Sequence, residues 1–246
     1  MKIAVFGDSY GNARNDKTRT GWPHQLADML NVSETDLDIY AWSGTSTWWS
    51  YQNFLKNYKK YDVIVFCYSS FFRWPVLPER LVGQHWRIPG MPLDEWTEME
   101  TYNKMYFDIV DDDLLRFLAT GLFSKVNELC KKENKFLINL LAFKRDYEIP
   151  YTDFPVYEDA NEISWNEKVI RNGKVTTMRE VICGIDDGNF GEYDVRICHL
   201  STENNRRLAS IFKHAIETRP IGICSDLFPE YEWAEYDDAV TAHYKK

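Results

Sequence analysis

Short apolar runs that alternate with amphipathic segments restrict the fold of this chain more than any other feature. Three runs are apolar on both faces, which is the pattern of strands buried in a parallel sheet: residues 2–6, 63–68 and 135–143. Residues 37–42 alternate and predict a further strand. Four segments carry apolar residues at helical spacing: residues 22–30, 46–61, 109–133 and 201–218. Because strands alternate with helices, the sequence predicts an α/β fold with a mostly parallel sheet.

Two long interruptions break this alternation. Residues 69–108 are rich in proline and tryptophan, and residues 144–193 include Asn172-Gly173, a pair typical of a hairpin turn. With no internal repeat or low-complexity linker, we expect one domain over residues 1–219 with both interruptions as insertions. The sequence pattern of the acidic, aromatic tail at residues 220–246 predicts neither its structure nor its role.

Composition excludes several classes of protein. The net charge of -9 argues against a nucleic-acid binder, and no window approaches the ~18 apolar residues of a membrane span. The five cysteines are widely spaced and form no CxxC pair, so we expect neither a disulfide framework nor a zinc site, and no cofactor. The start of the chain is not that of a signal peptide, which predicts synthesis in the cytoplasm. The 15% aromatic content indicates a core with loop anchors or, less simply, a binding surface.

The segment Gly7-Asp8-Ser9-Tyr10-Gly11 directly follows the first predicted strand. Ligands of open parallel sheets sit at the carboxyl ends of the strands, so a serine here is displayed at the ligand-binding edge. The glycines allow a tight turn and close approach of backbone to ligand. An Asp-Ser pair also forms ordinary turns, and this motif alone leaves both interpretations open.

Two further elements could complete a catalytic site. Gly44 follows the second strand and could aim its backbone N–H at an oxyanion, although an ordinary strand-to-helix turn explains it equally well. His199 lies just before the last predicted helix, where it could act as the base that an activated serine needs. A lone histidine is more often structural.

Taken in order, Gly7-Asp8-Ser9, Gly44 and His199 resemble the short motif blocks of the SGNH (GDSL-type) hydrolases. The resemblance implies a three-layer α/β/α sandwich with a flavodoxin-like sheet and long insertions. It also implies Ser9 as nucleophile, His199 as base, and the N–H groups of Ser9 and Gly44 in the oxyanion hole. In style, the chain is similar to members encoded by bacteriophages, which would allow a place in a virion.

The chain departs from the family pattern in two places. Tyr68 and Ser70 stand where the family has the glycine and asparagine of its third block, so the Ser70 hydroxyl is the expected third oxyanion donor. Loss of one such donor costs on the order of 3–4 kcal/mol in other enzymes. Arg196 stands where the family has the aspartate that orients the histidine, and Asp194 is the nearest upstream replacement. A Ser–His dyad and an inactive site remain open alternatives.

Two residues are predicted to bind substrate. Arg73 closely follows the third strand and could bind an anionic group, although a solvated loop arginine is the simpler interpretation. Asp8 is the second, from its place beside Ser9.

Three functions fit these observations. The first is a serine esterase that acts on a small ester or an O-acetylated carbohydrate. The second is a catalytically eroded binding or structural protein on the same fold, such as a bacteriophage virion component with a protein partner. The third, a flavodoxin-like phosphate binder that uses Ser9 and Thr45, is disfavoured by the net acidity and the lack of a glycine-rich loop.

Overall fold

The computed structural model describes residues 1–11, 19, 21–42, 45–69, 111–143, 152–158, 160–171, 174–177, 200, 202–224 and 233–235. Within them, the main sheet has six strands in the order β2-β1-β3-β4-β5-β8. Every neighbouring pair in this sheet is parallel. The strands are β1 (Ile3–Gly7), β2 (Leu37–Ala41), β3 (Val63–Tyr68), β4 (Phe136–Leu141), β5 (Val156–Glu158) and β8 (Ile223–Cys224). The predicted α/β fold with a parallel sheet is therefore confirmed.

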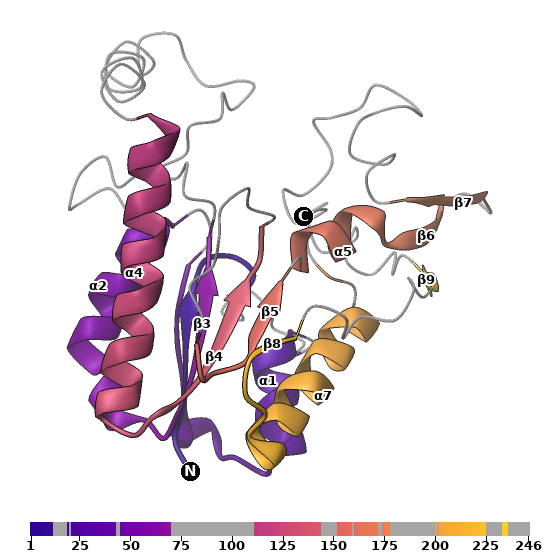
Figure 1. Cartoon of the computed structure of the whole chain (residues 1–246). Coiled ribbons are helices and arrows are strands. Elements are labelled where there is room, and N and C mark those ends of the chain that lie inside the picture. The colour runs from indigo at the N-terminus through magenta and orange to yellow at the C-terminus, as the bar shows by residue number, and fades with distance from the viewer. Residues whose placement is uncertain are drawn as a thin grey trace, which may run out of the picture.

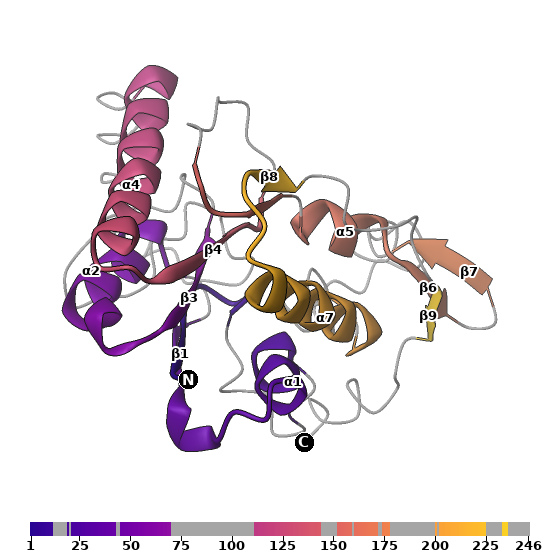
Figure 2. The same cartoon turned by 60° about the horizontal axis from the view of Figure 1, so that its bottom comes forward.

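Helices cover both faces of this sheet. One face carries α1 (Trp22–Met29) and α7 (Thr202–Thr218), and the other carries α2 (Thr47–Asn57) and α4 (Asp112–Lys132), as Figures 1 and 2 show. Each side has its own cluster of buried side chains. The molecule thus has the three layers expected of an α/β/α sandwich.

The two clusters differ in chemistry. On the α1/α7 side the strands contribute mainly aliphatic side chains, such as Val5 and Val65. On the α2/α4 side half of the buried residues in the cluster are aromatic: Phe6, Phe54, Tyr58, Tyr61, Phe66, Tyr68 and Phe123. The rings of Phe6 and Tyr40 stack 5.0 Å apart at 7°. Many of the aromatic residues in the described part of the chain therefore belong to the core.

Capping residues set the starts of two helices. Ser46 Oγ accepts a hydrogen bond from the Trp49 N–H at 3.2 Å, so α2 begins at Thr47. Asp111 caps α4 in the same way, which is why this helix begins at Asp112 and not at residue 109. The apolar pattern of residues 46–61 also included Leu55, but this side chain is 40% exposed, because α2 turns Thr47, Ser50 and Phe54 towards the sheet.

The second predicted insertion contains structure that the sequence pattern did not reveal. It includes β5 and a short helix, α5 (Ala160–Asn166). The predicted hairpin is confirmed, since β6 (Lys168–Arg171) and β7 (Lys174–Thr177) pair antiparallel with Arg171 opposite Lys174. A further strand, β9 (Trp233–Glu235), pairs with β6 to complete a small sheet.

The segment beyond residue 219 also contributes to the main sheet, because β8 pairs with β5. Two short 3-10 turns, η1 (Glu34–Asp36) and η2 (Tyr58–Lys60), precede β2 and β3. Of the first predicted insertion, only Ser69 lies within the described residues. No helix in the described part of the chain is long and apolar enough to cross a membrane.

Candidate functional site

The strand order places a topological switch point at β1. The chain passes from β1 to β2 on one side and then returns to place β3 on the other side of β1. In open α/β sheets, ligands bind outside the carboxyl ends of the strands at such a point. The segments that leave β1, β2 and β3 begin with Asp8, Trp42 and Ser69, so the candidate site lies where these three segments start.

Ser9 lies at this edge and is partly exposed. The backbone around it is tightly packed: a Cβ on Gly7 would lie 2.6 Å from Cys67 Cβ, and one on Gly11 would lie 2.9 Å from Val5 Cγ1. No side chain fits at either position without movement of its neighbours. The two glycines therefore let residues 7–11 pass close to the sheet, and Ser9 is the one residue of these five that is not buried.

Asp8 is fully buried and holds this loop from inside. Its Oδ1 accepts the Tyr10 N–H at 3.1 Å, its backbone carbonyl accepts the Gly11 N–H at 3.1 Å, and its Oδ2 accepts the Ser69 hydroxyl at 2.8 Å. Cys67 Sγ lies 3.9 Å from Oδ1. The carboxyl group thus sets the turn around Ser9 and joins the end of β1 to the end of β3.

Two threonines attach the β2–α2 connection to the same edge. Thr45 Oγ1 lies 2.7 Å from the Trp42 carbonyl oxygen and 3.2 Å from that of Gly7. Thr47 Oγ1 donates to the Ser69 carbonyl oxygen at 3.0 Å. The carboxyl ends of β1, β2 and β3 are therefore joined to one another by side-chain hydrogen bonds.

A second chain of contacts runs from the Ser9 loop to the start of α7. The Trp22 indole N–H donates to the Tyr10 carbonyl oxygen at 2.6 Å, and the Trp22 backbone N–H donates to Asn205 Oδ1 at 3.0 Å. Asn205 Nδ2 in turn donates to the Leu200 carbonyl oxygen at 2.8 Å. Trp22 is buried against the Phe212 ring. The residue after Ser9 and the residue after His199 are thus held by one tryptophan and one asparagine.

The Tyr10 side chain anchors the loop on a third side. Its hydroxyl donates to Asn161 Oδ1 at 2.8 Å and lies 3.0 Å from Ser164 Oγ, both on α5. Its ring packs edge-on against Phe143, which follows β4. The backbone that carries Ser9 is fixed by β3, α1 and α5 together.

Only part of the predicted site lies within the described residues. Ser9 and Asp8 are described, whereas the other predicted site residues lie outside: Gly44, Ser70, Arg73, Asp194 and His199. Asp8, predicted to bind substrate, has both carboxyl oxygens engaged by internal partners. Among the described residues, no group of three His, Cys, Asp or Glu side chains could hold a metal ion.

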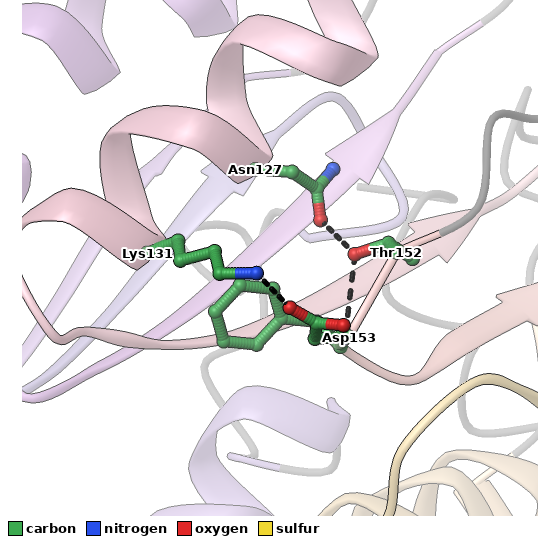
Figure 3. Close-up of polar contacts among 5 residues, drawn as sticks. Asn127, Lys131, Thr152 and Asp153 are labelled. Atoms are coloured by element: carbon green, nitrogen blue, oxygen red, sulfur yellow. Dashed lines mark hydrogen bonds and ion pairs between the residues drawn. The ribbon is translucent and has the colours of Figure 1, made fainter.

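Tyr68, the last residue of β3, packs in the cluster on the α2/α4 side of the sheet. Its hydroxyl donates to Asn139 Oδ1 on β4 at 3.1 Å, and Asn139 Nδ2 donates to Asn127 Oδ1 on α4 at 3.2 Å. Figure 3 shows how Thr152 also donates to Asn127, at 2.6 Å, beside an ion pair between Lys131 and Asp153. This second buried polar group ties α4 to the segment before β5.

Ser69 and Trp22 are contributors that sequence reasoning missed. The period-two alternation of β3 carries a signal for Ser69, because Cys67 and Ser69 share the strand face next to Asp8. Trp22 has no comparable signal, since its partner Asn205 lies 183 residues away in the sequence.

Comparison with known proteins gives weak likenesses. No family model and no curated protein matches the sequence. One similar solved structure belongs to a protein of Desulfitobacterium hafniense described as of the lipolytic G-D-S-L family, with 11% identity and a TM-score of 0.32 over 56% of this chain and 58% of that one. Another is an acetyl xylan esterase, with 14% identity and a TM-score of 0.41 over 88% of this chain and 100% of that one. Neither is described as a bacteriophage or virion protein, and likenesses at these TM-scores carry no weight for the activity of this chain.

Proposed function

We propose that the chain is a serine ester hydrolase of SGNH type that acts on a small ester or an O-acetylated carbohydrate. The observation that carries the proposal is the placement of Ser9. It leaves β1 at the switch point of a parallel sheet, partly exposed, on a loop held by Asp8 and Trp22. Serine nucleophiles need this combination of a rigid backbone and an exposed hydroxyl.

The contacts of Trp22 support His199 as the base. Tyr10 and Leu200, which follow Ser9 and His199 in the chain, are held by the same Trp22–Asn205 pair. In the proposed reaction, His199 takes the proton from Ser9 Oγ as this oxygen attacks the ester carbonyl. Asp194 holds the imidazole of His199.

The oxyanion of the tetrahedral intermediate receives hydrogen bonds from the N–H groups of Ser9 and Gly44 and from the Ser70 hydroxyl. Collapse of the intermediate breaks the ester C–O bond, and His199 returns the proton to the leaving alcohol. A water molecule then attacks the acyl-enzyme and loses a proton to His199. The bond between the acyl carbon and Ser9 Oγ breaks, His199 returns the proton to Oγ, and the acid leaves.

Trp42 supports a carbohydrate substrate. Its backbone N–H donates to the Gly7 carbonyl oxygen at 3.3 Å, so it lies beside the loop that carries Ser9, and it is 43% exposed. The electron-rich face of an indole attracts the apolar C–H face of a sugar ring. Arg73 is the proposed partner for any anionic group on the substrate.

Labelling with a fluorophosphonate tests the proposal, because this reagent reacts covalently with activated serines. By intact mass, the wild type is expected to gain one adduct that Ser9→Ala and His199→Ala both lose. Hydrolysis of p-nitrophenyl acetate should fall to the background rate in both variants. A well-folded wild type without an adduct would contradict the proposal.

Tyr68 favours a second candidate, a binding or structural protein on an eroded hydrolase fold. Its side chain fills the aromatic core at a position where the family carries glycine. On this alternative, which includes a virion component, a protein partner would co-purify equally with the wild type and Ser9→Ala. Loss of the partner in Ser9→Ala would count against it.

A further inference from the structure

Each predicted oxyanion donor has a buried polar residue as its direct neighbour in the chain. The pairs are Asp8 with Ser9, Thr45 with Gly44, and Ser69 with Ser70. All three neighbours have an exposed fraction of 0%. Burial of polar side chains is unfavourable unless they are hydrogen-bonded, so three of them beside three donors need a physical reason.

Hydrogen bonds join these neighbours in a closed path around the switch point. Asp8 Oδ2 accepts from Ser69 at 2.8 Å, and the Ser69 carbonyl oxygen accepts from Thr47 at 3.0 Å. Thr45 lies in the β2–α2 connection two residues before Thr47, the first residue of α2, and Thr45 Oγ1 lies 3.2 Å from the Gly7 carbonyl oxygen, next to Asp8. The path therefore passes from β1 to β3, to the start of α2, to the end of β2 and back to β1.

We propose that Asp8, Thr45, Thr47 and Ser69, called the edge network below, set the relative positions of the three oxyanion donors. This inference rests on the proposed hydrolase function. Asp8 is the centre of the network, because it bonds both the Tyr10 N–H that shapes the Ser9 turn and the hydroxyl next to Ser70. It acts through other residues and is a positioning residue, a role that replaces the substrate contact expected from its sequence position.

The geometry of oxyanion stabilisation explains why such a network matters. Donors stabilise the transition state only when they are already aimed at the developing charge, and a displacement of about 1 Å costs on the order of 100-fold in rate. Because the three donors follow three different strands, no single element holds them in register. Bonds between the strand ends supply that register.

Removal of single hydroxyl groups tests the edge network. Ser69→Ala and Thr47→Val each delete one buried donor with little change in side-chain shape. Thr152→Val is the matched control, because it deletes the buried hydroxyl that donates to Asn127 at 2.6 Å in the polar group of Figure 3. The readout is fluorophosphonate labelling per folded molecule, resolved into kinact and KI.

We expect Ser69→Ala to lower kinact roughly 10-fold to 100-fold, with KI within about twofold of the wild type. Thr47→Val should lower kinact less, because it acts through the Ser69 backbone. Thr152→Val should lower thermal stability by a similar amount to Thr47→Val and leave kinact unchanged. Equal kinact for the wild type and Ser69→Ala would overturn the inference.

Variants of Asp8 distinguish a role in positioning the oxyanion donors from a role in stabilising the fold alone. Asp8→Ala should lower kinact more than Ser69→Ala does, to a rate that is still measurable, whereas Asp8→Asn should recover part of the loss, because its carbonyl can accept the Tyr10 N–H and its amide can donate to Ser69 Oγ. The double variant Asp8→Ala/Ser69→Ala should label no more slowly than Asp8→Ala, since both changes break one bond. Additive losses would contradict the shared bond.

Amide hydrogen exchange distinguishes a failure of this inference from a failure of the proposed function. Asp8→Ala and Ser69→Ala should both accelerate exchange in residues 42–46, a segment to which neither residue belongs, and Thr152→Val should not. If the wild type is never labelled but this exchange pattern holds, the hydrolase proposal fails and the edge network stands. Unchanged exchange in residues 42–46 would overturn the edge network whatever the labelling result.

Discussion

The two ends of the main sheet use buried and exposed carboxyl groups differently. At the carboxyl ends of the strands, Asp8 is completely buried and bonds Tyr10 and Ser69, which follow β1 and β3. At the amino ends, Asp62 and Asp38 are exposed. Asp62 accepts the Lys2 N–H at 2.8 Å.

At the amino end, hydrogen bonds join the first residues of neighbouring strands. The Asp62 and Val63 N–H groups both donate to the Lys2 carbonyl oxygen, at 2.9 and 3.1 Å. Tyr61 donates its hydroxyl to Asp38 at 2.6 Å, where water can also reach the carboxylate. Because desolvation of a carboxyl group is unfavourable and the amino end of the sheet forms without a buried one, the buried Asp8 supports the carboxyl end as the proposed functional edge.

Gly7→Ala should have the largest effect on stability, because it adds a methyl group at the closest contact of the carboxyl edge. The new Cβ would lie 2.6 Å from Cys67 Cβ, which is itself fully buried. We expect a loss of about 2 kcal/mol in the free energy of unfolding, measured in urea, together with slower labelling of Ser9.

Gly121→Ala is the matched control on α4, where the added Cβ would meet nothing within 4 Å. This helix should gain up to about 1 kcal/mol from the substitution. Equal stability of Gly7→Ala and the wild type would show that β1 and β3 can separate at no cost, against the tight edge described above.

Tyr61→Phe probes the amino edge. It removes the bond to Asp38 and the contact with the Tyr40 hydroxyl at 2.7 Å. The free energy of unfolding should fall by about 1 kcal/mol, while kinact for Ser9 stays at the wild-type value. A large loss of labelling would erase the proposed distinction between the two ends.

The stability of the amino edge should also depend on pH. Burial, followed by the hydrogen bond to Asp38, raises the pKa of Tyr61 far above its ordinary value. The unfolded chain then loses this proton first, so the stabilisation is complete below pH about 10 and is lost as the pH rises above it. Unfolding in urea between pH about 8.5 and 11 should show a steeper fall for the wild type than for Tyr61→Phe, and identical slopes would contradict the assignment.

Trp42→Ala should have the smallest effect on stability, within about 0.5 kcal/mol, because the side chain is 43% exposed. On the proposed function it should raise KM severalfold for an acetylated oligosaccharide and leave KM for a simple alkyl acetate unchanged. Steady-state kinetics with the two substrates checks this. Equal changes for both would remove the carbohydrate contact from the proposal.

Much of the fold was predictable from apolar periodicity. The strands β1, β3 and β4 carry runs that are apolar on both faces, and these runs place them closely. In contrast, β5 has only three residues and β8 only two, too few to show any period. Their pairing depends on the neighbouring strands, which local sequence does not reveal.

The turn that carries Ser9 was predictable from the sequence, whereas the contacts that hold this turn were not. The Gly7-Asp8-Ser9 segment predicts a turn, because glycine and aspartate favour turns through their own local conformations. The bond from Ser69 to Asp8 spans 61 residues and the bond from Trp22 to Asn205 spans 183, so both depend on the assembled sheet and helices. The catalytic and substrate-binding roles predicted for this site stay untested for all seven residues: Ser9, Asp8, His199, Gly44, Ser70, Asp194 and Arg73.

The contact between Trp22 and Asn205 has a consequence for when the proposed activity can arise during synthesis. The whole edge network lies within the first 69 residues, whereas the start of α7 is made more than 130 residues later. At ordinary translation rates this is a delay on the order of 10 s. On the proposed function, a nascent chain that ends before α7 has the residues of the edge network but lacks the proposed base, so it should not hydrolyse esters until α7 docks.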